Sequence, residues 1–290
     1  MAAIRKIGNP GNRTGNKEAS NTFFQNMMEK KETKIICFAN NKNRCGKTTT
    51  VAAVGQTWAD CKFKVLLVDL DAQATLTSMI TGTDPAKKEW ERTIENALIE
   101  RKGLPIAEIS EYMHIVPADM ELSNFERVTS YMQGREFLLS DLLESVKGEY
   151  DYILIDCPSS LGMLTYNAML AANYLVIVTN AEAQSYRGMN MVLDLYREIH
   201  ANKRLNPTLS VAGVFVTQYV KEKMAELYLE LIKKDTGPIL INPVIRKSRK
   251  FVQAPGIQKS IFELDPEGKT VMEYRKGATD LVLRIEGGFV

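Results

Sequence analysis

The sequence predicts an α/β fold in which a doubly wound, mostly parallel sheet carries helices on both faces. Three observations lead to this prediction. Short, nearly continuous apolar runs alternate with stretches of helical length and spacing. Strands that are apolar on both faces are what a parallel sheet covered by helices requires, and their alternation with helices favours a doubly wound order. The chain of 290 residues, 45% of them hydrophobic, is long enough to bury a large core.

The expected strands are, in chain order, KIICFA from Lys34, KVLLVDL from Lys64, YDYILID from Tyr150, YLVIVT from Tyr174, LSVAGVFVT from Leu209 and a weaker GPILIN from Gly237. The intervening stretches 48–60, 134–146 and 185–201 have the length and apolar spacing of helices. No internal repeat interrupts this order. We therefore expect a single domain over residues 34–290.

The first 33 residues differ from the rest because they are rich in Asn, Gly, Lys and Arg and have few apolar positions. Such a composition does not offset the entropy cost of folding, so a flexible tail is predicted over 1–33, with a short helix near 23–31. Through Lys34 the chain has seven Lys or Arg against three acids, while its total net charge is only +2. The basic charge is therefore local to the tail.

The four cysteines are Cys37, Cys45, Cys61 and Cys157, and they show neither a C-x-x-C pair nor metal-ligand spacing. Buried free thiols are the expected state, which suits a reducing compartment. No apolar run approaches the ~20 residues that span a bilayer, and the N-terminus lacks the apolar stretch of a signal peptide. We expect a cytoplasmic protein that does not bind membranes.

A glycine-lysine-threonine motif follows the first expected strand, where residues 40–50 read NNKNRCGKTTT and an apolar helix begins. In a P-loop, backbone N–H groups at a helix N-terminus point at phosphates, the lysine neutralises the β- and γ-phosphates, and the first hydroxyl ligates Mg²⁺. Lys47 and Thr48 supply these groups, and Gly46 lets the backbone approach. The strict pattern asks for glycine where this chain has Asn41, but the strand-to-helix placement supports a site for ATP or ADP with Mg²⁺.

Two further strands end in acids, with Asp69 and Asp71 after one and Asp156 after the other. In open α/β sheets, ligands bind outside the carboxyl ends of strands, so these acids would face a nucleotide held at the first strand. Holding Mg²⁺ through water, as a Walker B acid does, is the natural role for Asp156. The alternative is that these acids cap the helices that follow them.

Four segments together define a family resemblance: Lys42 with 46–49, then 69–73, then 156–162 with Thr165, Asn167 and Ala168, and finally 245–255 followed by 262–266. Over roughly residues 34–283 the chain resembles the ParA/MinD family of deviant Walker A ATPases, and in particular ParA-type (Soj-like) DNA-partition ATPases. The resemblance implies the P-loop NTPase fold.

The resemblance also implies roles for individual residues. Lys42 would be the signature lysine that reaches the partner's nucleotide in an ATP-dependent homodimer, Lys47 would bind the β- and γ-phosphates, and Asp71 would orient the attacking water. Thr48 and Asp156 would hold Mg²⁺, Thr49 would bind the α-phosphate, and Pro255 would lie near the adenine. The nucleotide-binding residues are then Asn41, Lys42, Asn43, Arg44, Cys45, Gly46, Lys47, Thr48, Thr49 and Pro255.

The chain departs from the family's pattern at Asn43 and Arg44, which replace two glycines after the signature lysine. Since Asn tolerates positive φ, Asn43 is expected to keep the loop conformation. Arg44 would either add a phosphate contact or block the dimer. Ala72 in place of Pro is a milder change. We expect ATP binding to survive these changes more readily than hydrolysis, and hydrolysis more readily than the tight dimer.

The resemblance implies a function in ATP-dependent partition of a plasmid, mobile element or chromosome, in association with the nucleoid. ATP would drive dimerisation, the dimer would bind DNA without sequence preference, and a centromere-binding ParB-type partner would stimulate slow hydrolysis. The basic residues Arg246, Lys247, Arg249 and Lys250 suit non-specific DNA binding, although a solvated charged loop is the alternative. Other functions left open are a nucleotide-binding scaffold with little or no turnover and another MinD-like positioning ATPase. A membrane-bound form would need a basic amphipathic C-terminal helix, where this chain reads RIEGGFV.

Overall fold

The structure is a computed structural model that describes residues 32–84, 87, 89–248, 250, 262 and 265–287. The predicted helix at 23–31 lies outside these residues, as do Arg249 and Pro255. The boundary predicted between a tail and a domain at residues 33 and 34 stays a prediction.

A seven-stranded sheet in the order β3-β4-β2-β5-β1-β6-β7 forms the centre of the fold. The strands are β1 (Lys34–Ala39), β2 (Val65–Asp69), β3 (Ala107–Ser110), β4 (Met113–Val116), β5 (Tyr152–Asp156), β6 (Tyr174–Asn180) and β7 (Ser210–Thr217). All neighbouring strands are parallel except β3, which runs antiparallel to β4. The predicted mostly parallel, doubly wound sheet is therefore confirmed.

The register of the central strands brings their carboxyl ends together at one edge of the sheet. Asp156 at the end of β5 lies beside Phe38 of β1 on one side and Asp69 of β2 on the other. Loops that leave these strands consequently meet at this edge, which is where ligands bind in open α/β sheets.

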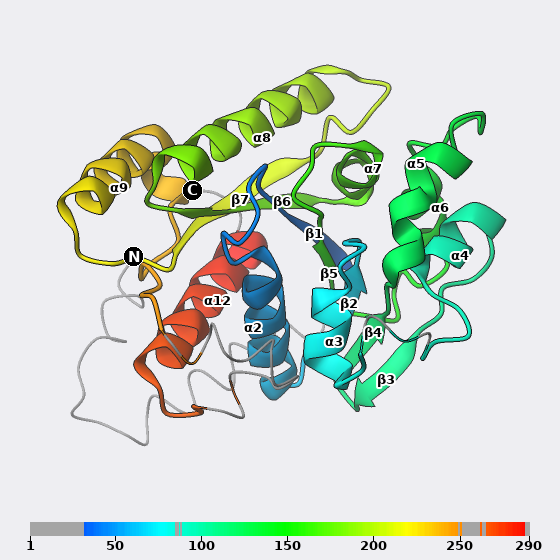
Figure 1. The fold of residues 1–290 in the computed structure, drawn as a ribbon, viewed down its shortest axis with the longest axis horizontal. Coiled ribbons are helices and arrows are strands. Elements are labelled where there is room, and N and C mark those ends of the chain that lie inside the picture. The colour runs from blue at the N-terminus through cyan, green and yellow to red at the C-terminus, as the bar shows by residue number, and fades with distance from the viewer. Residues whose placement is uncertain are drawn as a thin grey trace. The chain divides into compact units, whose positions relative to one another are not determined.

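Helices cover both faces of the sheet (Figure 1). One face carries α2 (Lys47–Asp60), α3 (Thr75–Thr81) and α12 (Lys269–Gly287), and the other carries α4 (Ile94–Glu100), α5 (Phe125–Val128), α6 (Leu138–Glu144), α7 (Met163–Ala171) and α8 (Ala183–Ala201). Helix α9 (Lys223–Thr236) packs against α8, and two short 3₁₀ helices span Met120–Asn124 and Gly237–Ile239. The predicted helices at 48–60, 134–146 and 185–201 correspond to α2, a shorter α6, and α8.

Close packing fixes α2 against the sheet and against α12. A Cβ added to Gly55 would lie 2.7 Å from Leu67 Cδ2, so only glycine permits this approach of helix to strand. The Trp58 indole donates a hydrogen bond of 3.0 Å to the Ala278 carbonyl of α12, and its ring lies 4.4 Å from that of Tyr152. The N-terminus of α2 is thereby held at the edge where the strands end.

One sequence prediction is wrong, and two strands were not predicted. The GPILIN segment is not a strand, because Gly237–Ile239 is a 3₁₀ helix and only Leu240 forms an isolated bridge, to Val214. Pro238 lacks the N–H that a strand would need. Strands β3 and β4 were not predicted, since each has four residues and β3 at the sheet edge alternates between half-buried and exposed positions.

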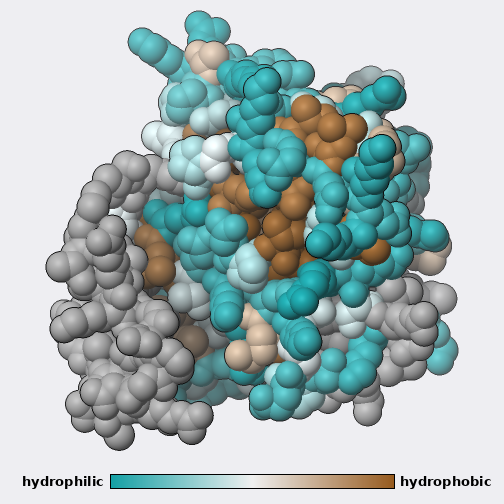
Figure 2. Space-filling model, turned by 90° about the vertical axis from the view of Figure 1, so that its left-hand side faces the viewer, coloured by the Kyte–Doolittle hydropathy of each residue, from teal (hydrophilic) through white to brown (hydrophobic). Residues whose placement is uncertain are grey.

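Helix α9 leaves part of its apolar surface uncovered by the described residues. Its Met224 and Leu227 side chains are 59% and 52% exposed. Figure 2 shows an apolar area among hydrophilic side chains on the side of the molecule where α9 lies. No helix in the described part of the chain has the length and apolar character needed to cross a membrane.

Candidate functional site

The predicted phosphate cradle is a loop between β1, which ends at Ala39, and α2, which begins at Lys47. Gly46 caps the helix at φ 90°, and a Cβ added there would lie 2.9 Å from Thr217 Oγ1. Both the positive φ and the close approach therefore require glycine. Gly46 has no side chain to cap the first turn of α2, and the N-terminus of a helix favours an anion.

The two predicted phosphate-binding lysines lie on this loop in different surroundings. Lys47 is only 7% exposed, and its Nζ donates a hydrogen bond of 3.0 Å to the Lys42 carbonyl. The Lys42 side chain is 28% exposed, with its Nζ 3.8 Å from Glu182 Oε1. Lys47 thus lies inside the cradle, whereas Lys42 lies at its rim beside the start of α8.

The first half of the loop is held by β6 and α8. Asn40 Nδ2 donates to the carbonyls of Val178 and Ser185, at 2.8 and 3.3 Å. A Cβ on Gly188 of α8 would lie 2.3 Å from Asn40 Oδ1, so glycine at this position allows α8 to approach the loop. Asn41, whose Nδ2 lies 3.2 Å from Met191 Sδ, contacts the same helix.

The second half of the loop is held by the end of β7. Thr217 Oγ1 donates to the Cys45 carbonyl at 2.6 Å, and Gln218 Nε2 donates to the Arg44 carbonyl at 2.9 Å. Arg44 has φ 59°, so the prediction that Asn43 takes the positive φ is wrong. The left-handed conformation costs a non-glycine residue roughly 1–2 kcal/mol, and the hydrogen bond from Gln218 helps to offset this cost.

Asp156 is fully buried at the end of β5, and neither of its carboxylate oxygens has a hydrogen-bond partner in the described structure. Burial raises its pKa well above the usual range, the neighbouring Asp69 raises the pKa further, and Thr48 and Lys47 oppose this. A buried carboxylate without a partner is costly, and this cost is relieved when a cation binds.

Thr48 and Asp156 fit Mg²⁺ because both offer oxygen ligands, which this hard cation prefers. Thr48 lies half-buried in the first turn of α2, and the unpartnered carboxylate of Asp156 lies close enough for the two residues to interact. The described residues contain no group of three or more His, Cys, Asp or Glu side chains suited to a metal ion.

Asp69 is equally buried but has partners. Its Oδ2 accepts hydrogen bonds from the Thr77 backbone N–H and hydroxyl, at 2.9 and 2.8 Å, and its Oδ1 accepts one from Asp71 N at 3.1 Å. Burial raises the pKa of Asp69 to about 6, although these hydrogen bonds act in the opposite direction. Thr77 lies in the first turn of α3, so the helix-capping alternative holds for Asp69.

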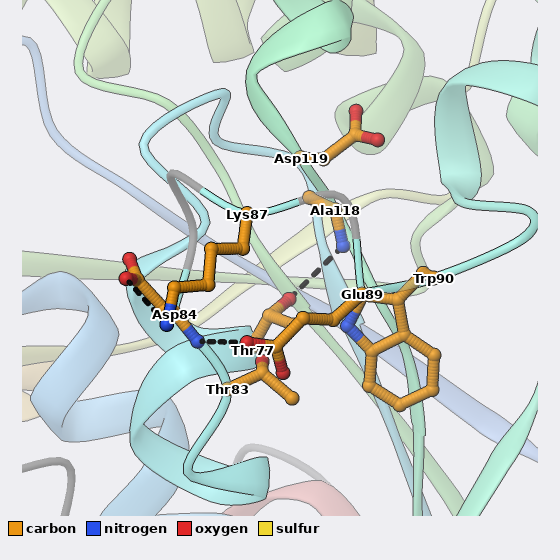
Figure 3. Close-up of a pocket in the computed structure, with 8 residues that line it drawn as sticks. All are labelled: Thr77, Thr83, Asp84, Lys87, Glu89, Trp90, Ala118 and Asp119. Carbon is orange, nitrogen blue, oxygen red and sulfur yellow. Dashed lines mark hydrogen bonds and ion pairs between the residues drawn. The ribbon is translucent and has the colours of Figure 1, made fainter.

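A small pocket lies beyond Thr77, whose hydroxyl also accepts a hydrogen bond of 2.9 Å from Ala118 N (Figure 3). It is lined by Thr77, Thr83, Asp84, Lys87, Glu89, Trp90, Ala118 and Asp119. None of these residues belongs to the cradle, so the pocket is separate from the candidate nucleotide site.

The remaining predicted cradle residues lie at the same edge of the sheet. Asp71 is half-buried two residues beyond β2, and its Oδ1 accepts a hydrogen bond of 3.0 Å from Gln73 N. Thr49 is half-buried in the first turn of α2, Asn43 is exposed, and Cys45 is buried.

All four cysteines are free thiols, with Cys61 half-buried and the others buried, which confirms the predicted free thiols.

The predicted DNA-binding residues are partly paired with acids. The Arg246 guanidinium and backbone N–H both bind the Glu273 carboxylate, and Lys250 Nζ lies 2.8 Å from Asp265. Lys247 is exposed and makes no ion pair within the described part of the chain. Its backbone N–H donates to the Tyr219 carbonyl at 3.0 Å, so this segment begins beside the end of β7.

Sequence reasoning missed Asn40, Gly188, Thr217 and Gln218. Thr217 and Gln218 follow an apolar strand just as the acids do, and this signal would have drawn attention to them. Asn40 directly follows β1 and gives the same signal. For Gly188, which lies within a helix, no local pattern indicated a contact with the loop.

A strand, a glycine-lysine-threonine loop with a buried lysine, a helix, and an unpartnered acid on the adjacent strand define a P-loop NTPase. A family model described as an AAA domain matches residues 33–211. An uncharacterized protein of Pseudomonas putida is 34% identical over 255 residues, covering 87% of this chain and 95% of that protein. The chromosome-partitioning ATPase Soj of Treponema pallidum is 31% identical over 254 residues, covering 87% and 98%.

Among solved structures, cobyrinic acid a,c-diamide synthase from Mycobacterium smegmatis, with bound ADP and magnesium, has a TM-score of 0.76 and 26% identity, covering 89% of this chain and 97% of that one. The chain belongs to the ParA/MinD family of P-loop ATPases.

Proposed function

We propose that the protein is a DNA-partition ATPase that alternates between an ATP-bound, DNA-binding dimer and a released form. The observation that carries the proposal is the buried Asp156, whose carboxylate has no hydrogen-bond partner in the described structure and lies near Lys47 and Thr48 of the cradle. The resemblance to a partitioning ATPase supports the partition role. The protein would act in the cytoplasm on the nucleoid, with a ParB-type partner stimulating hydrolysis.

Each cradle residue has a role in this proposal. Mg²⁺, when bound by Thr48 and Asp156, would neutralise charge on the β- and γ-phosphates. Lys47 would hold these phosphates, and the N–H groups at the start of α2, with Thr49, would hold the α-phosphate. Asp71 would orient the attacking water. Lys42, at the rim, would reach the nucleotide of the second subunit, and Pro255 would lie near the adenine.

The first test is Lys47→Ala, which removes the buried cation that offsets phosphate charge. We expect ATP binding to be lost in a calorimetric titration. Lys203→Ala is the control, because this exposed lysine lies in a loop after α8, outside the cradle, and should leave ATP affinity within a few fold of the parent. Unchanged affinity in Lys47→Ala would refute the assignment of the cradle.

The second test concerns DNA. Lys247 is exposed and without an ion pair in the described structure, so Lys247→Glu should reduce ATP-dependent DNA retention more than substitutions at the acid-paired Arg246 or Lys250. Lys203→Glu, in an exposed loop after α8, is the control. If each subunit neutralises two to four phosphates, retention should fall with salt with a log-log slope of roughly -4 to -7. If DNA retention is the same in Lys247→Glu as in the parent and does not depend on nucleotide, this surface does not bind DNA.

A nucleotide-binding scaffold is the second candidate, favoured by Asn43 and Arg44 in place of two glycines. The two candidates differ in turnover. Phosphate release by the purified protein, measured with and without DNA, should exceed the spontaneous rate for a switch and remain at that rate for a scaffold.

A further inference from the structure

We propose that Thr217 and Gln218, at the end of β7, are positioning residues that orient the N–H groups of the phosphate cradle. The inference rests on phosphate binding by the cradle, as proposed above, and assigns to β7 a role in shaping that site. Neither residue belongs to the cradle, and their side chains reach it from more than 170 residues away in the sequence.

The contact is a matched pair of hydrogen bonds. Thr217 Oγ1 donates to the Cys45 carbonyl at 2.6 Å, and Gln218 Nε2 donates to the Arg44 carbonyl at 2.9 Å. Two consecutive side chains thus hold two consecutive carbonyls. Thr217 is fully buried and Gln218 is half-buried, so water competes little for the first bond and moderately for the second.

These bonds also fix the orientation of the N–H groups that follow the two carbonyls, because the peptide bond is planar and trans. In each peptide unit the C=O and the following N–H point in opposite directions. Drawing the Arg44 and Cys45 oxygens toward β7 therefore turns the N–H groups of Cys45 and Gly46 away from β7. Those N–H groups precede the first turn of α2, where a phosphate oxygen would accept hydrogen bonds from them.

The backbone conformation explains why this loop needs such a hold. Arg44 has φ 59° and Gly46 has φ 90°. Glycine adopts such values readily, whereas arginine prefers negative φ, which would rotate the neighbouring peptide units. Gln218 also has a positive φ, of 52°, and its side chain donates to the Arg44 carbonyl. The bonds from β7 hold the loop in a shape that arginine alone would not keep.

The test uses side chains of matched size that lack the donor, Gln218→Leu and Thr217→Val. The control is Thr179→Val, because Thr179 is buried near the end of the neighbouring strand β6 and donates to Asn180, outside the cradle. Affinity is measured for ATP and for inorganic tripolyphosphate by competition against a fluorescent ADP analogue. Losing one such bond should weaken both ligands about 3- to 10-fold, and the control should stay within about 2-fold.

Tripolyphosphate separates this role from its main alternative. If Gln218→Leu weakens ATP but not tripolyphosphate, Gln218 contacts the base or ribose and the proposal is wrong. Unchanged affinity for both ligands in a variant that keeps its melting temperature would overturn it equally. Should Thr217→Val fail to fold, Gln218→Leu at its half-buried position still decides the question.

A double-mutant cycle with Arg44→Gly tests the backbone argument. Because glycine accepts positive φ without strain, Gln218→Leu should weaken tripolyphosphate less in the Arg44→Gly background than in the parent. Equal effects in both backgrounds would show that Gln218 acts independently of the conformation at position 44. Only ligand binding is measured, so a parent protein without turnover or DNA binding would count against the partition function and leave this result standing.

Discussion

Asp69 and Asp156 occupy facing positions at the ends of neighbouring strands, and both are fully buried, yet their surroundings differ. The oxygens of Asp69 accept three hydrogen bonds from Thr77 and Asp71, whereas those of Asp156 accept none in the described structure. The segment after each strand makes the difference. After β2, the backbone N–H and hydroxyl of Thr77 in α3 donate to Asp69, whereas after β5 no described residue up to the start of α7 donates to Asp156. The same residue type thus completes a helix in one place and leaves a site open in the other.

The largest expected effect is that of Asp71→Ala, which tests whether Asp71, beyond the end of β2, has only a structural role. Asp71→Ala should keep ATP affinity within a few fold but lower turnover roughly 100-fold or more, since orienting water matters for hydrolysis and little for ground-state binding. Phosphate release and calorimetry measure the two quantities. The control is Asp119→Ala, at an acid beyond β4 that caps a 3₁₀ helix. Turnover that matches the control would make Asp71 another capping acid.

Asp156→Asn should separate function from stability at the end of β5. Without the carboxylate, Mg²⁺-dependent nucleotide affinity should fall about 10- to 100-fold. Because the amide removes a buried charge that lacks a partner, the nucleotide-free protein should gain about 1 kcal/mol of unfolding free energy. Calorimetry with and without Mg²⁺, together with urea unfolding, measures both effects. A loss of stability would mean that Asp156 is held by a partner after all.

Asp69→Asn should have the opposite effect on stability. An amide in place of the carboxylate puts a donor against the N–H or hydroxyl donors of Thr77 and Asp71, so at least one contact is lost. We expect the unfolding free energy, measured by urea unfolding, to be about 2 kcal/mol lower than in the parent. The comparison between the two acids fails if both asparagine variants change stability in the same direction.

The smallest effect is a pH dependence. The folded-state pKa of Asp69 is about 6, above the usual 3.8, so the folded protein binds more protons than the unfolded chain between these values. The resulting stability is present below pH ~4 and is lost as the pH rises through about 6. The stability difference between the parent and Asp69→Asn should therefore be about 1 kcal/mol larger at pH 5 than at pH 7.5. Urea unfolding of the nucleotide-free proteins at both values measures it, and a constant difference would contradict the raised pKa.

Local patterns predicted the parts of the fold that depend on local sequence. Strand β1 and the start of α2 follow from an apolar run and a glycine-lysine-threonine motif, so the cradle's position was predictable. The loop's conformation was not predictable. Residue type favours Asn43 for a positive φ, but Arg44 adopts it, and Gln218 donates a hydrogen bond to the Arg44 carbonyl. The different roles of Asp69 and Asp156 were equally hidden, since they depend on where Thr77 packs. Edge strands such as β3 bury too little surface to give a clear apolar run.

The hydrogen bonds from β6 and β7 to the cradle also bear on how the protein folds. Asn40 donates to the Val178 carbonyl, 138 residues later, and Arg44 and Cys45 accept bonds from side chains 174 and 172 residues later. Such long-range contacts form only after the chain between them has closed, which makes them late steps in assembly. A nascent chain that has not yet released Gln218 therefore carries the complete glycine-lysine-threonine motif without an ordered cradle. Nucleotide binding would then select chains whose sheet is already built, and ATP would stabilise finished molecules rather than fragments.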